Sequence, residues 1–345
     1  MSTSSRVVYL VGPEQLELRE VPAPAPGAGE LVVRLEGATT CGTDVKVYRR
    51  GGHPRMLTVP GPFGHEMAGT VEAKGSETHG WNEGDEVVIA NSASCGECAA
   101  CGSHRENLCT DLHYLNGAYG ERILVPERFV RRSLYRKPEG LDPGIAALAE
   151  PLACVLHGTE LLSLQDTEEI VVLGGGPIGL LFVNVLSHRG HHVVLADPNV
   201  SRLEAGKRMG ASAVIPVRKT ESDTEAIRSQ ATRDGFGVAI EATGSPLAWE
   251  SAVGSVRPGG KVLLFGGCAP GTTVPLDTHR LHYSELSLLG GYHHRPKTFA
   301  MAIETLADGK IASDVLLTAE LPLEEVGSAL KLMMEKKALK VRIRV

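Results

Sequence analysis

Short apolar runs separated by turn residues dominate the first 150 positions of the chain. Runs rich in Val, Ile and Leu lie at residues 6–11, 30–37, 69–75, 85–90 and 121–126, with Gly, Pro and Asn clusters between them. Apolar runs bounded by turn residues are typical of β-strands. The stretch Pro22–Glu30 lies between two such runs, and we interpret it as a surface connection within one domain. The pattern predicts an irregular β domain over residues 1–150.

The pattern changes near Glu150, because short apolar strands then alternate with helical segments. The predicted strands are residues 170–174, 193–197, 212–216, 237–244, 261–267 and 286–291. This alternation predicts an α/β domain with a parallel, doubly wound sheet over residues 151–291. Two helix-like segments, Lys297–Ala307 and Leu323–Lys336, precede a last strand-like run, Lys340–Val345. We expect residues 292–345 to return to the first domain.

Composition narrows the class of protein. The 35 Lys and Arg against 41 Asp and Glu give a net charge of −6, whereas a nucleic-acid-binding protein needs a basic surface. We find no stretch that approaches the roughly 20 apolar residues of a membrane span. The first ten residues also lack the apolar centre of a signal peptide. We therefore expect a cytoplasmic protein that binds neither nucleic acid nor membrane, in which the seven cysteines do not form disulfides.

A glycine-rich turn follows the strand at 170–174. It has the G-x-G-x-x-G spacing between that strand and a predicted helix, and its residues are Gly174, Gly176, Pro177, Ile178 and Gly179. Glycines at this spacing allow a tight turn and a close approach of the backbone to a pyrophosphate at the helix N-terminus. The next strand ends at Asp197, eighteen residues beyond the last glycine. The turn therefore predicts a dinucleotide site.

Asp197 sets the expected cofactor. Its carboxylate is placed to accept hydrogen bonds from the adenosine ribose and would repel a 2′-phosphate, which favours NAD over NADP. Arg202 either lines the adenine side of the site or is an exposed helix residue. A glycine-rich turn without a ligand is the alternative, and the combination of strand, helix and acid argues against it.

Four cysteines crowd into fifteen residues with the pattern C-x2-C-x2-C-x7-C; they are Cys95, Cys98, Cys101 and Cys109. Four thiolates close a tetrahedral zinc shell and leave no position for substrate, so we expect a structural zinc in a lobe at about residues 91–113. An iron–sulfur cluster uses the same ligands and stays an alternative.

A second set of possible ligands is dispersed along the chain. Its members are Cys41, the pair His65 and Glu66, and Glu150. Singly, each is more often a buried small residue or a surface charge. Together with a dinucleotide site, they provide the thiolate, imidazole and carboxylate ligands of an open catalytic zinc site.

These residues resemble the zinc-dependent medium-chain dehydrogenases, especially the branch of sorbitol, other polyol and threonine dehydrogenases. The resemblance spans essentially the whole chain. It is carried by residues 41–44 (CGTD), 64–66 (GHE) with Gly69, the four-cysteine lobe, 150–153 (EPLA) and the glycine turn. It implies a GroES-like β-rich catalytic domain that holds both zinc ions and a Rossmann domain that binds the cofactor.

The resemblance also implies roles for individual residues. Cys41 and His65 would bind the catalytic zinc directly, and Glu150, with Glu66 directly or through water, would complete the shell in exchange with substrate. Cys154, one helical turn after Glu150, is either a competing ligand or a core residue. Asp44 would orient the site from outside the ligand shell.

The expected reaction is oxidation of an alcohol whose hydroxyl pKa the zinc lowers, with hydride transfer to NAD. Thr43 matches the hydroxyl of the family that accepts the substrate proton. Polyol and threonine dehydrogenases usually have a histidine where this chain has Lys46. Lys46 or His53 would therefore end the proton relay, and the alternative for Lys46 is a solvent-exposed residue or one that binds the cofactor phosphate.

The substrate is less defined than the chemistry. Polar residues able to line a hydroxyl-rich pocket are Tyr48, His53, Tyr114, His293 and His294. We expect a secondary alcohol on a polyol, sugar or cyclitol-like molecule. The alternatives are an amino-alcohol dehydrogenase of the threonine type and a cofactor-binding protein without catalysis. By resemblance, the strand at 286–291 would pair with a second copy in a homodimer or homotetramer.

Overall fold

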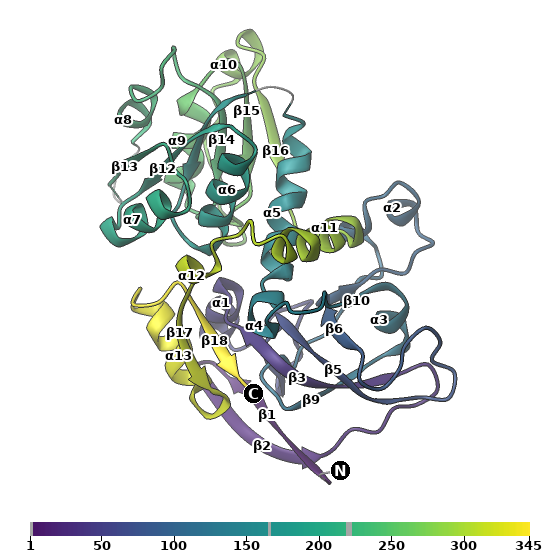
Figure 1. Cartoon of the computed structure of the whole chain (residues 1–345). Coiled ribbons are helices and arrows are strands. Elements are labelled where there is room, and N and C mark those ends of the chain that lie inside the picture. Colours follow the sequence, from purple (N-terminus) through teal and green to yellow (C-terminus); the bar gives the residue numbers. More distant parts are fainter. Residues whose placement is uncertain (1–2, 165–166, 219–222) are drawn as a thin grey trace. The chain divides into compact units, whose positions relative to one another are not determined.

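The computed structural model describes residues 3–164, 167–218 and 223–345. Packing divides the chain into two compact units (Figure 1). The first comprises Met1–Ala153, His294–Gly309 and Leu317–Val345. The second comprises Cys154–His293 and Lys310–Leu316.

The first unit is built on sheets in which most strand pairs are antiparallel. One sheet has the order β2-β1-β4, and a larger one has the order β10-β6-β5-β3-β18-β17, with β9 also paired to β3. The strands are β1 (Ser4–Gly12), β2 (Gln15–Pro22), β3 (Leu31–Thr39), β4 (Gly61–Pro62), β5 (Met67–Lys74), β6 (Glu86–Ile89), β9 (Arg122–Val125), β10 (Leu134–Arg136), β17 (Leu317–Pro322) and β18 (Lys340–Arg344). A separate ribbon joins β7 (Ser92–Ala93) and β8 (His113–Tyr114). Buried side chains from both sheets, among them Leu10 and Val33, belong to one hydrophobic core cluster.

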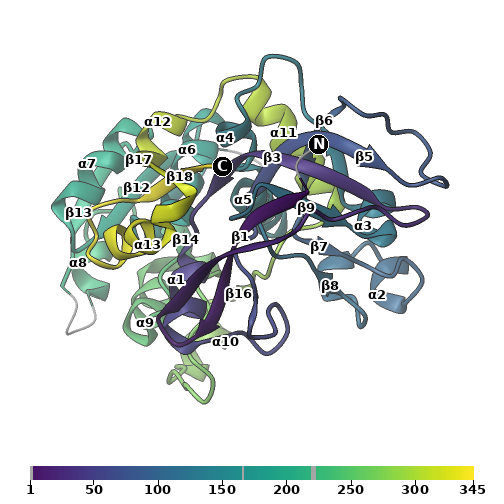
Figure 2. The same cartoon turned by 90° about the horizontal axis from the view of Figure 1, so that it is seen from below.

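The last strand of the chain, β18, pairs with β3 from the N-terminal part of the chain. Ile343 lies opposite Ala38 and Arg342 opposite Thr39, antiparallel to β3, while β17 pairs with the other side of β18 in parallel. Figure 2 shows the yellow C-terminal strand beside the dark purple β3. This pairing brings Lys340 to the segment that leads into Cys41.

Short helices connect the strands of the first unit. They are α1 (Gly42–Arg50), α2 (Ala99–Gly102), η1 (Glu106–Leu108), α3 (Glu127–Arg132), α4 (Pro143–Ala146), α11 (Pro296–Ala307), η2 (Leu323–Glu325) and α13 (Val326–Met334). Helix α1 has caps at both ends, because Asp44 accepts from the backbone of Cys41 and Gly51 takes the left-handed conformation at φ 71°. Its N-terminal cap is therefore part of the ligand segment predicted from sequence.

The second unit contains a parallel sheet with the order β13-β12-β11-β14-β15-β16 within the described residues. The strands are β11 (Glu169–Leu173), β12 (His192–Asp197), β13 (Ala213–Pro216), β14 (Phe236–Glu241), β15 (Val256–Leu264) and β16 (Ser287–Gly290). The strand order reverses direction at β11, as in a doubly wound sheet. Strands β11, β12 and β14 are almost entirely buried, which explains their continuous apolar runs.

Helices connect the strands of the parallel sheet. The helices of this unit are α5 (Ala149–Leu162), which begins in the first unit, α6 (Pro177–His188), α7 (Val200–Arg208), α8 (Thr224–Arg228), α9 (Pro246–Ser255), α10 (Thr278–Tyr283) and α12 (Ser313–Leu316). Helices α6, α7 and α9 contact strands of the sheet. Helix α6 packs with α7, and α8 packs with α9. Right-handed crossovers place these two pairs on opposite faces of the sheet.

One sequence expectation needs correction. The helical stretch Pro143–Leu162 has 20 residues. Within it, a window of 18 residues has a mean hydropathy of 1.4 and at most two charged residues, so by length and composition it matches a membrane span. In the sequence, Glu150 and Glu160 interrupt this apolar run, so it does not stand out as one continuous segment. In the structure 83% of that window is buried, as in the core helix of a globular protein.

Candidate functional site

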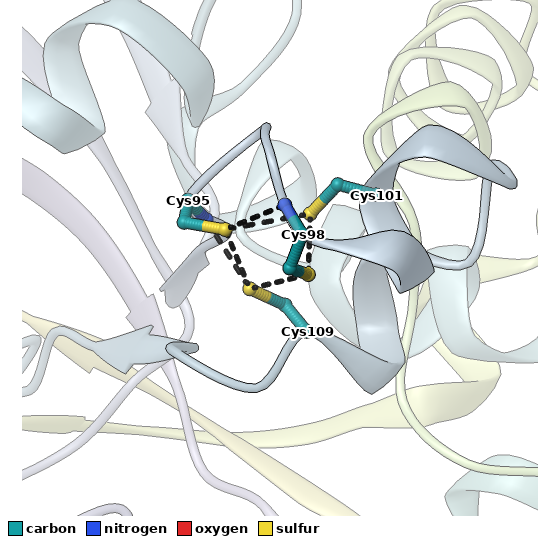
Figure 3. Close-up of side chains that lie close together, drawn as sticks. All are labelled: Cys95, Cys98, Cys101 and Cys109. Carbon is teal, nitrogen blue, oxygen red and sulfur yellow. Dashed lines mark hydrogen bonds between the residues drawn. The ribbon is translucent and has the colours of Figure 1, made fainter.

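Four thiols converge in the loop between β7 and β8 (Figure 3). Cys98 caps helix α2, Cys101 lies within it, and Cys109 follows η1. The Sγ–Sγ distances are 3.4 Å for Cys95–Cys109, 3.6 Å for Cys98–Cys101, 3.8 Å for Cys98–Cys109 and 3.9 Å for Cys95–Cys101. The four predicted cysteines therefore lie together, all without a disulfide.

The spacing of these sulfurs fits a tetrahedral metal site. A zinc ion with four Zn–S bonds of about 2.3 Å has sulfurs about 3.8 Å apart. Backbone N–H groups of Cys101 and Thr110 lower the pKa of Cys98 to about 5, whereas burial raises the pKa of Cys109 to about 12. A divalent cation would stabilise all four as thiolates, so the donor set fits a closed structural site.

A second group of ligand atoms forms where β3 ends and β5 begins. The ligand atoms of Cys41, His65 and Glu66 all lie within 4.8 Å of one another. The antiparallel pairing of β3 with β5 explains this, because Ala38 at the end of β3 lies opposite Met67 at the start of β5. Residues that follow β3 therefore lie close to those that precede β5. Residues that are 24 positions apart in sequence therefore form one site.

A buried carboxylate holds this group in place. Asp44, 1% exposed, accepts from His65 Nδ1 at 2.9 Å, from the Tyr119 hydroxyl at 2.6 Å and from the Cys41 backbone N–H at 2.9 Å. Burial acts to raise the pKa of Asp44, but the charge of His65 outweighs it and the pKa is lowered. Because Nδ1 of His65 is bonded to Asp44, Nε2 is the nitrogen available to a metal.

Glu66 is bound by a lysine that the sequence analysis did not identify. Lys340 Nζ lies 2.8 Å from Glu66 Oε1 and 2.6 Å from Oε2, and the Thr39 hydroxyl also donates to Oε2. Burial acts to lower the pKa of Lys340, yet the Glu66 carboxylate prevails and the pKa is raised. Both carboxylate oxygens of Glu66 are therefore hydrogen-bonded, beside Cys41 and His65.

Glu150 is not within the close group of Cys41, His65 and Glu66. It lies in the first turn of α5, where Asn91 Nδ2 donates to its Oε1 at 3.1 Å. His294 Nε2 in turn bonds Asn91 Oδ1 at 2.9 Å. Burial raises the pKa of Glu150 to about 7, a shift that the charge of His65 opposes. Asn91 and His294 therefore fix the orientation of this carboxylate, and His294 is a buried support here.

The predicted proton-relay residues lie on or after α1. Thr43 is half-buried in the first turn, with its N–H 3.4 Å from Cys41 Sγ, and Lys46 is exposed on the same helix. His53 uses Nδ1 to accept from the backbone N–H groups of Arg55 and Met56 at 3.2 and 3.0 Å. Only Nε2 of His53 is thus available for proton exchange.

The glycine turn has the close approaches that its sequence predicts. Gly174 has a φ of 109°, and a Cβ on Gly179 would lie 1.8 Å from the Gly174 carbonyl oxygen. Pro177 begins α6, Ile178 follows it, and Gly176 has open space around its Cα. Only glycine fits at 174 and 179, and the open side at Gly176 leaves the helix N-terminus accessible.

Asp197 lies beside this turn at the end of β12. Its carboxylate accepts from the backbone N–H groups of Gly175 and Asn199, both at 2.7 Å, and Arg202 Nη1 lies 3.9 Å away. Asp197 and Arg202 line a cavity of 360 Å³ together with Gly174 and residues of α8 and α9. The position and size of the cavity suit the adenosine half of a dinucleotide.

Three residues that support the site were not predicted from the sequence: Lys340, Asn91 and Tyr119. Each is far from its partner in sequence, and none belongs to a spacing pattern. Only Lys340 has an indirect signal in the sequence. It begins a strand with apolar residues, and a lysine buried there needs a partner for its charge.

Comparisons with known proteins agree with this geometry. The family described as Alcohol dehydrogenase GroES-like domain matches residues 27–135. The family described as Zinc-binding dehydrogenase matches residues 177–308. The first covers Cys41, His65, Glu66 and the four-cysteine lobe, and the second covers the glycine turn from Pro177 onward.

Similar whole chains are dehydrogenases. Sorbitol dehydrogenase of Bacillus subtilis is 31% identical over 339 residues, covering 95% of this chain and 94% of that protein. L-threonine 3-dehydrogenase of Yersinia pestis is 27% identical over 334 residues, covering 95% of this chain and 96% of that protein. A putative zinc-binding dehydrogenase of Sinorhizobium meliloti, solved bound to NADP, superposes with a TM-score of 0.90 at 27% identity and full coverage of both chains.

These matches confirm the predicted fold class, a GroES-like β-rich domain with a Rossmann domain. They also confirm the resemblance inferred from the residues. The chain belongs to the zinc-dependent medium-chain dehydrogenase family, within the alcohol dehydrogenase superfamily.

Proposed function

We propose that this protein is a zinc-dependent oxidoreductase that transfers hydride between a secondary alcohol and NAD. The alcohol would belong to a polyol, sugar or cyclitol-like molecule. The observation that carries the proposal is the close group of half-buried Cys41 with buried His65 and Glu66 in one unit, together with Asp197 beside the glycine turn of the other.

The donor set fits a catalytic metal. Cys41, His65 and Glu150 would hold the zinc, with Glu66 acting directly or through water, and when bound the ion would polarise the alcohol oxygen for hydride loss to the nicotinamide. Asp44 keeps the proton of His65 on Nδ1 and so leaves Nε2 as a ligand. The Thr43 hydroxyl would take the substrate proton, and Lys46 or His53 would release it to solvent.

The cofactor preference rests on Asp197. A 2′-phosphate would meet its negative charge, and the carboxylate is held at this position by two backbone N–H groups. The Sinorhizobium relative was solved with NADP, so the proposal of NAD for this chain depends on its own Asp197. Arg202 would lie against the adenine side of the cavity.

An amino-alcohol substrate is the second candidate. The similarity to L-threonine 3-dehydrogenase over 95% of the chain supports it. We further propose one structural zinc in the four-cysteine lobe, a homodimer or homotetramer, and a cytoplasmic location. Strand β16 at the edge of the parallel sheet supports pairing with a second copy.

The test is a substrate panel. Zinc-loaded protein with NAD⁺ or NADP⁺ is mixed with sorbitol, inositols, simple secondary alcohols and L-threonine, and absorbance at 340 nm is followed. We expect NADH from a polyol or cyclitol, loss of that activity in Cys41→Ser, and little NADPH. NADH from L-threonine alone would favour the second candidate, and no reduced cofactor from any alcohol would refute the proposed chemistry.

A further inference from the structure

Lys340 is a charged residue that the proposed reaction does not yet use. Its side chain is 1% exposed and that of Glu66 is 0% exposed. The ammonium has three protons and three short partners, namely the Thr40 carbonyl at 2.6 Å and the two oxygens of Glu66 at 2.8 and 2.6 Å. Its hydrogen-bonding capacity is therefore used entirely on Glu66 and the backbone that leads to Cys41.

The backbone fixes the position of this ammonium. Val341 N–H donates to the Thr40 hydroxyl at 2.8 Å, and Thr40 N–H donates to the Val341 carbonyl at 3.0 Å. These bonds tie the start of β18 to the residue before Cys41. Lys340 is thus held in a fixed position beside Cys41, His65 and Glu66, although it lies near the other end of the chain in sequence. A lysine on the surface would not be fixed in this way.

Glu66 is within reach of the ligand group but already occupied. One of its oxygens lies within 4.8 Å of the ligand atoms of Cys41 and His65. Both oxygens accept from Lys340, and Oε2 also accepts from Thr39. Direct binding of Glu66 to a metal would require it to give up bonds to a buried cation, which is costly because an unpaired buried charge is strongly unfavourable.

The charges of the group lead to the same conclusion. A divalent ion with one thiolate, one neutral imidazole and the Glu150 carboxylate is a neutral set. Adding Glu66 as a ligand makes the set negative and fills the position that an alcohol needs. Lys340 cancels the charge of Glu66 where it stands, so the metal keeps both its charge balance and its open position.

We propose that Lys340 is a positioning residue that holds Glu66 beside the catalytic metal as a non-ligand, so that one coordination position stays open for substrate. The inference rests on the proposed catalytic zinc. It selects between the two roles that Glu66 has in the proposed function.

The experiment uses cobalt in place of zinc, because the d–d bands of cobalt(II) depend on the identity and the number of its ligands. The spectrum of Cys41→Ser, which keeps cobalt in the four-cysteine lobe, is subtracted as the baseline. Wild type is compared with Lys340→Met, Lys340→Arg, Glu66→Gln and the double variant Lys340→Met with Glu66→Gln. Lys137→Met is the matched control, since Lys137 is also a buried lysine with carbonyl partners but belongs to another part of the first unit.

We expect Lys340→Met to shift the d–d bands, because Glu66 would then occupy the position that is otherwise open to substrate. Metal release should also slow by about 10- to 100-fold, which is the range over which residues that support the ligands change metal affinity. Glu66→Gln should keep the wild-type spectrum, the double variant should regain it, and Lys340→Arg should stay close to it. Lys137→Met should leave the spectrum unchanged.

Two results would overturn the inference. An unchanged spectrum in Lys340→Met, with cobalt present at both sites of the wild type, would show that Lys340 does not control Glu66. A changed spectrum in Glu66→Gln would show that Glu66 is already a ligand, and this measurement remains decisive if Lys340→Met does not fold. If wild type binds cobalt only in the four-cysteine lobe, the proposed catalytic metal itself is refuted, and the inference with it.

Discussion

Replacing Asp44 with asparagine tests how strongly the buried carboxylate supports metal binding. Asparagine keeps the shape of the side chain but presents one acceptor and one donor group in place of two acceptors. If its NH₂ faces His65, Nδ1 must accept and the proton moves to Nε2, the proposed ligand. If its NH₂ faces the other way, it opposes the donors of Tyr119 and Cys41.

The size of the effect follows from these contacts. A hydrogen bond to a charged group contributes about 1.5–3 kcal/mol, and either orientation of the asparagine loses at least one such bond. At about 1.4 kcal/mol for each factor of ten, the affinity for catalytic zinc should fall by about 10- to 100-fold. The four-cysteine lobe is a separate cluster, so its zinc should stay bound.

The assay is competition with a colorimetric zinc chelator, in which the lobe zinc serves as an internal reference. Asp111→Asn is the matched control, because Asp111 also pairs with a histidine, His113 Nε2 at 3.0 Å, but both side chains are more than half exposed. An Asp44→Asn protein that folds and holds two zinc ions with wild-type affinity would refute the role given to Asp44.

Three further predictions concern the other sites. Gly179→Ala should distort the glycine turn and abolish NAD binding, because the new Cβ would lie 1.8 Å from the Gly174 carbonyl oxygen. Gly176→Ala has open space for its Cβ, so the protein should keep its melting temperature while its affinity for NAD, measured by calorimetry, falls. Cys101→Ser should reduce the zinc content by one ion per chain and lower the melting temperature, and an unchanged metal content would contradict a structural site. Asp197→Ala should raise kcat/KM with NADP⁺ relative to NAD⁺ by at least about 10-fold, and an unchanged ratio would show that Asp197 does not select the cofactor.

Local patterns in the sequence predicted the parallel sheet, the glycine turn and the four-cysteine lobe. In each of these the partners lie within one short segment, or the strands are buried on both faces and appear as continuous apolar runs. Strands β2 and β17 were missed because they alternate apolar and polar residues instead of forming a run. The sequence therefore reveals best the elements whose signal is continuous.

The residues that support the site were harder to predict from the sequence. Asp44 lies three residues from Cys41 and was expected to orient the site, and it does contact His65. Lys340 contacts Glu66 across 274 positions, beside the pairing of β18 with β3, and Asn91 contacts Glu150 across 59. No local spacing in the sequence indicates either contact. Tertiary structure, not residue type, makes these side chains part of the site.

The most direct measurement of the central claim follows an isotope. An alcohol from the panel, deuterated at its carbinol carbon, is incubated with NAD⁺ and zinc-loaded protein, and the NADH is examined by mass spectrometry. We predict one deuterium in the NADH, formed by wild type and lost in Cys41→Ser. Unlabelled NADH, or labelled NADH formed equally well by Cys41→Ser, would contradict metal-dependent hydride transfer at this site.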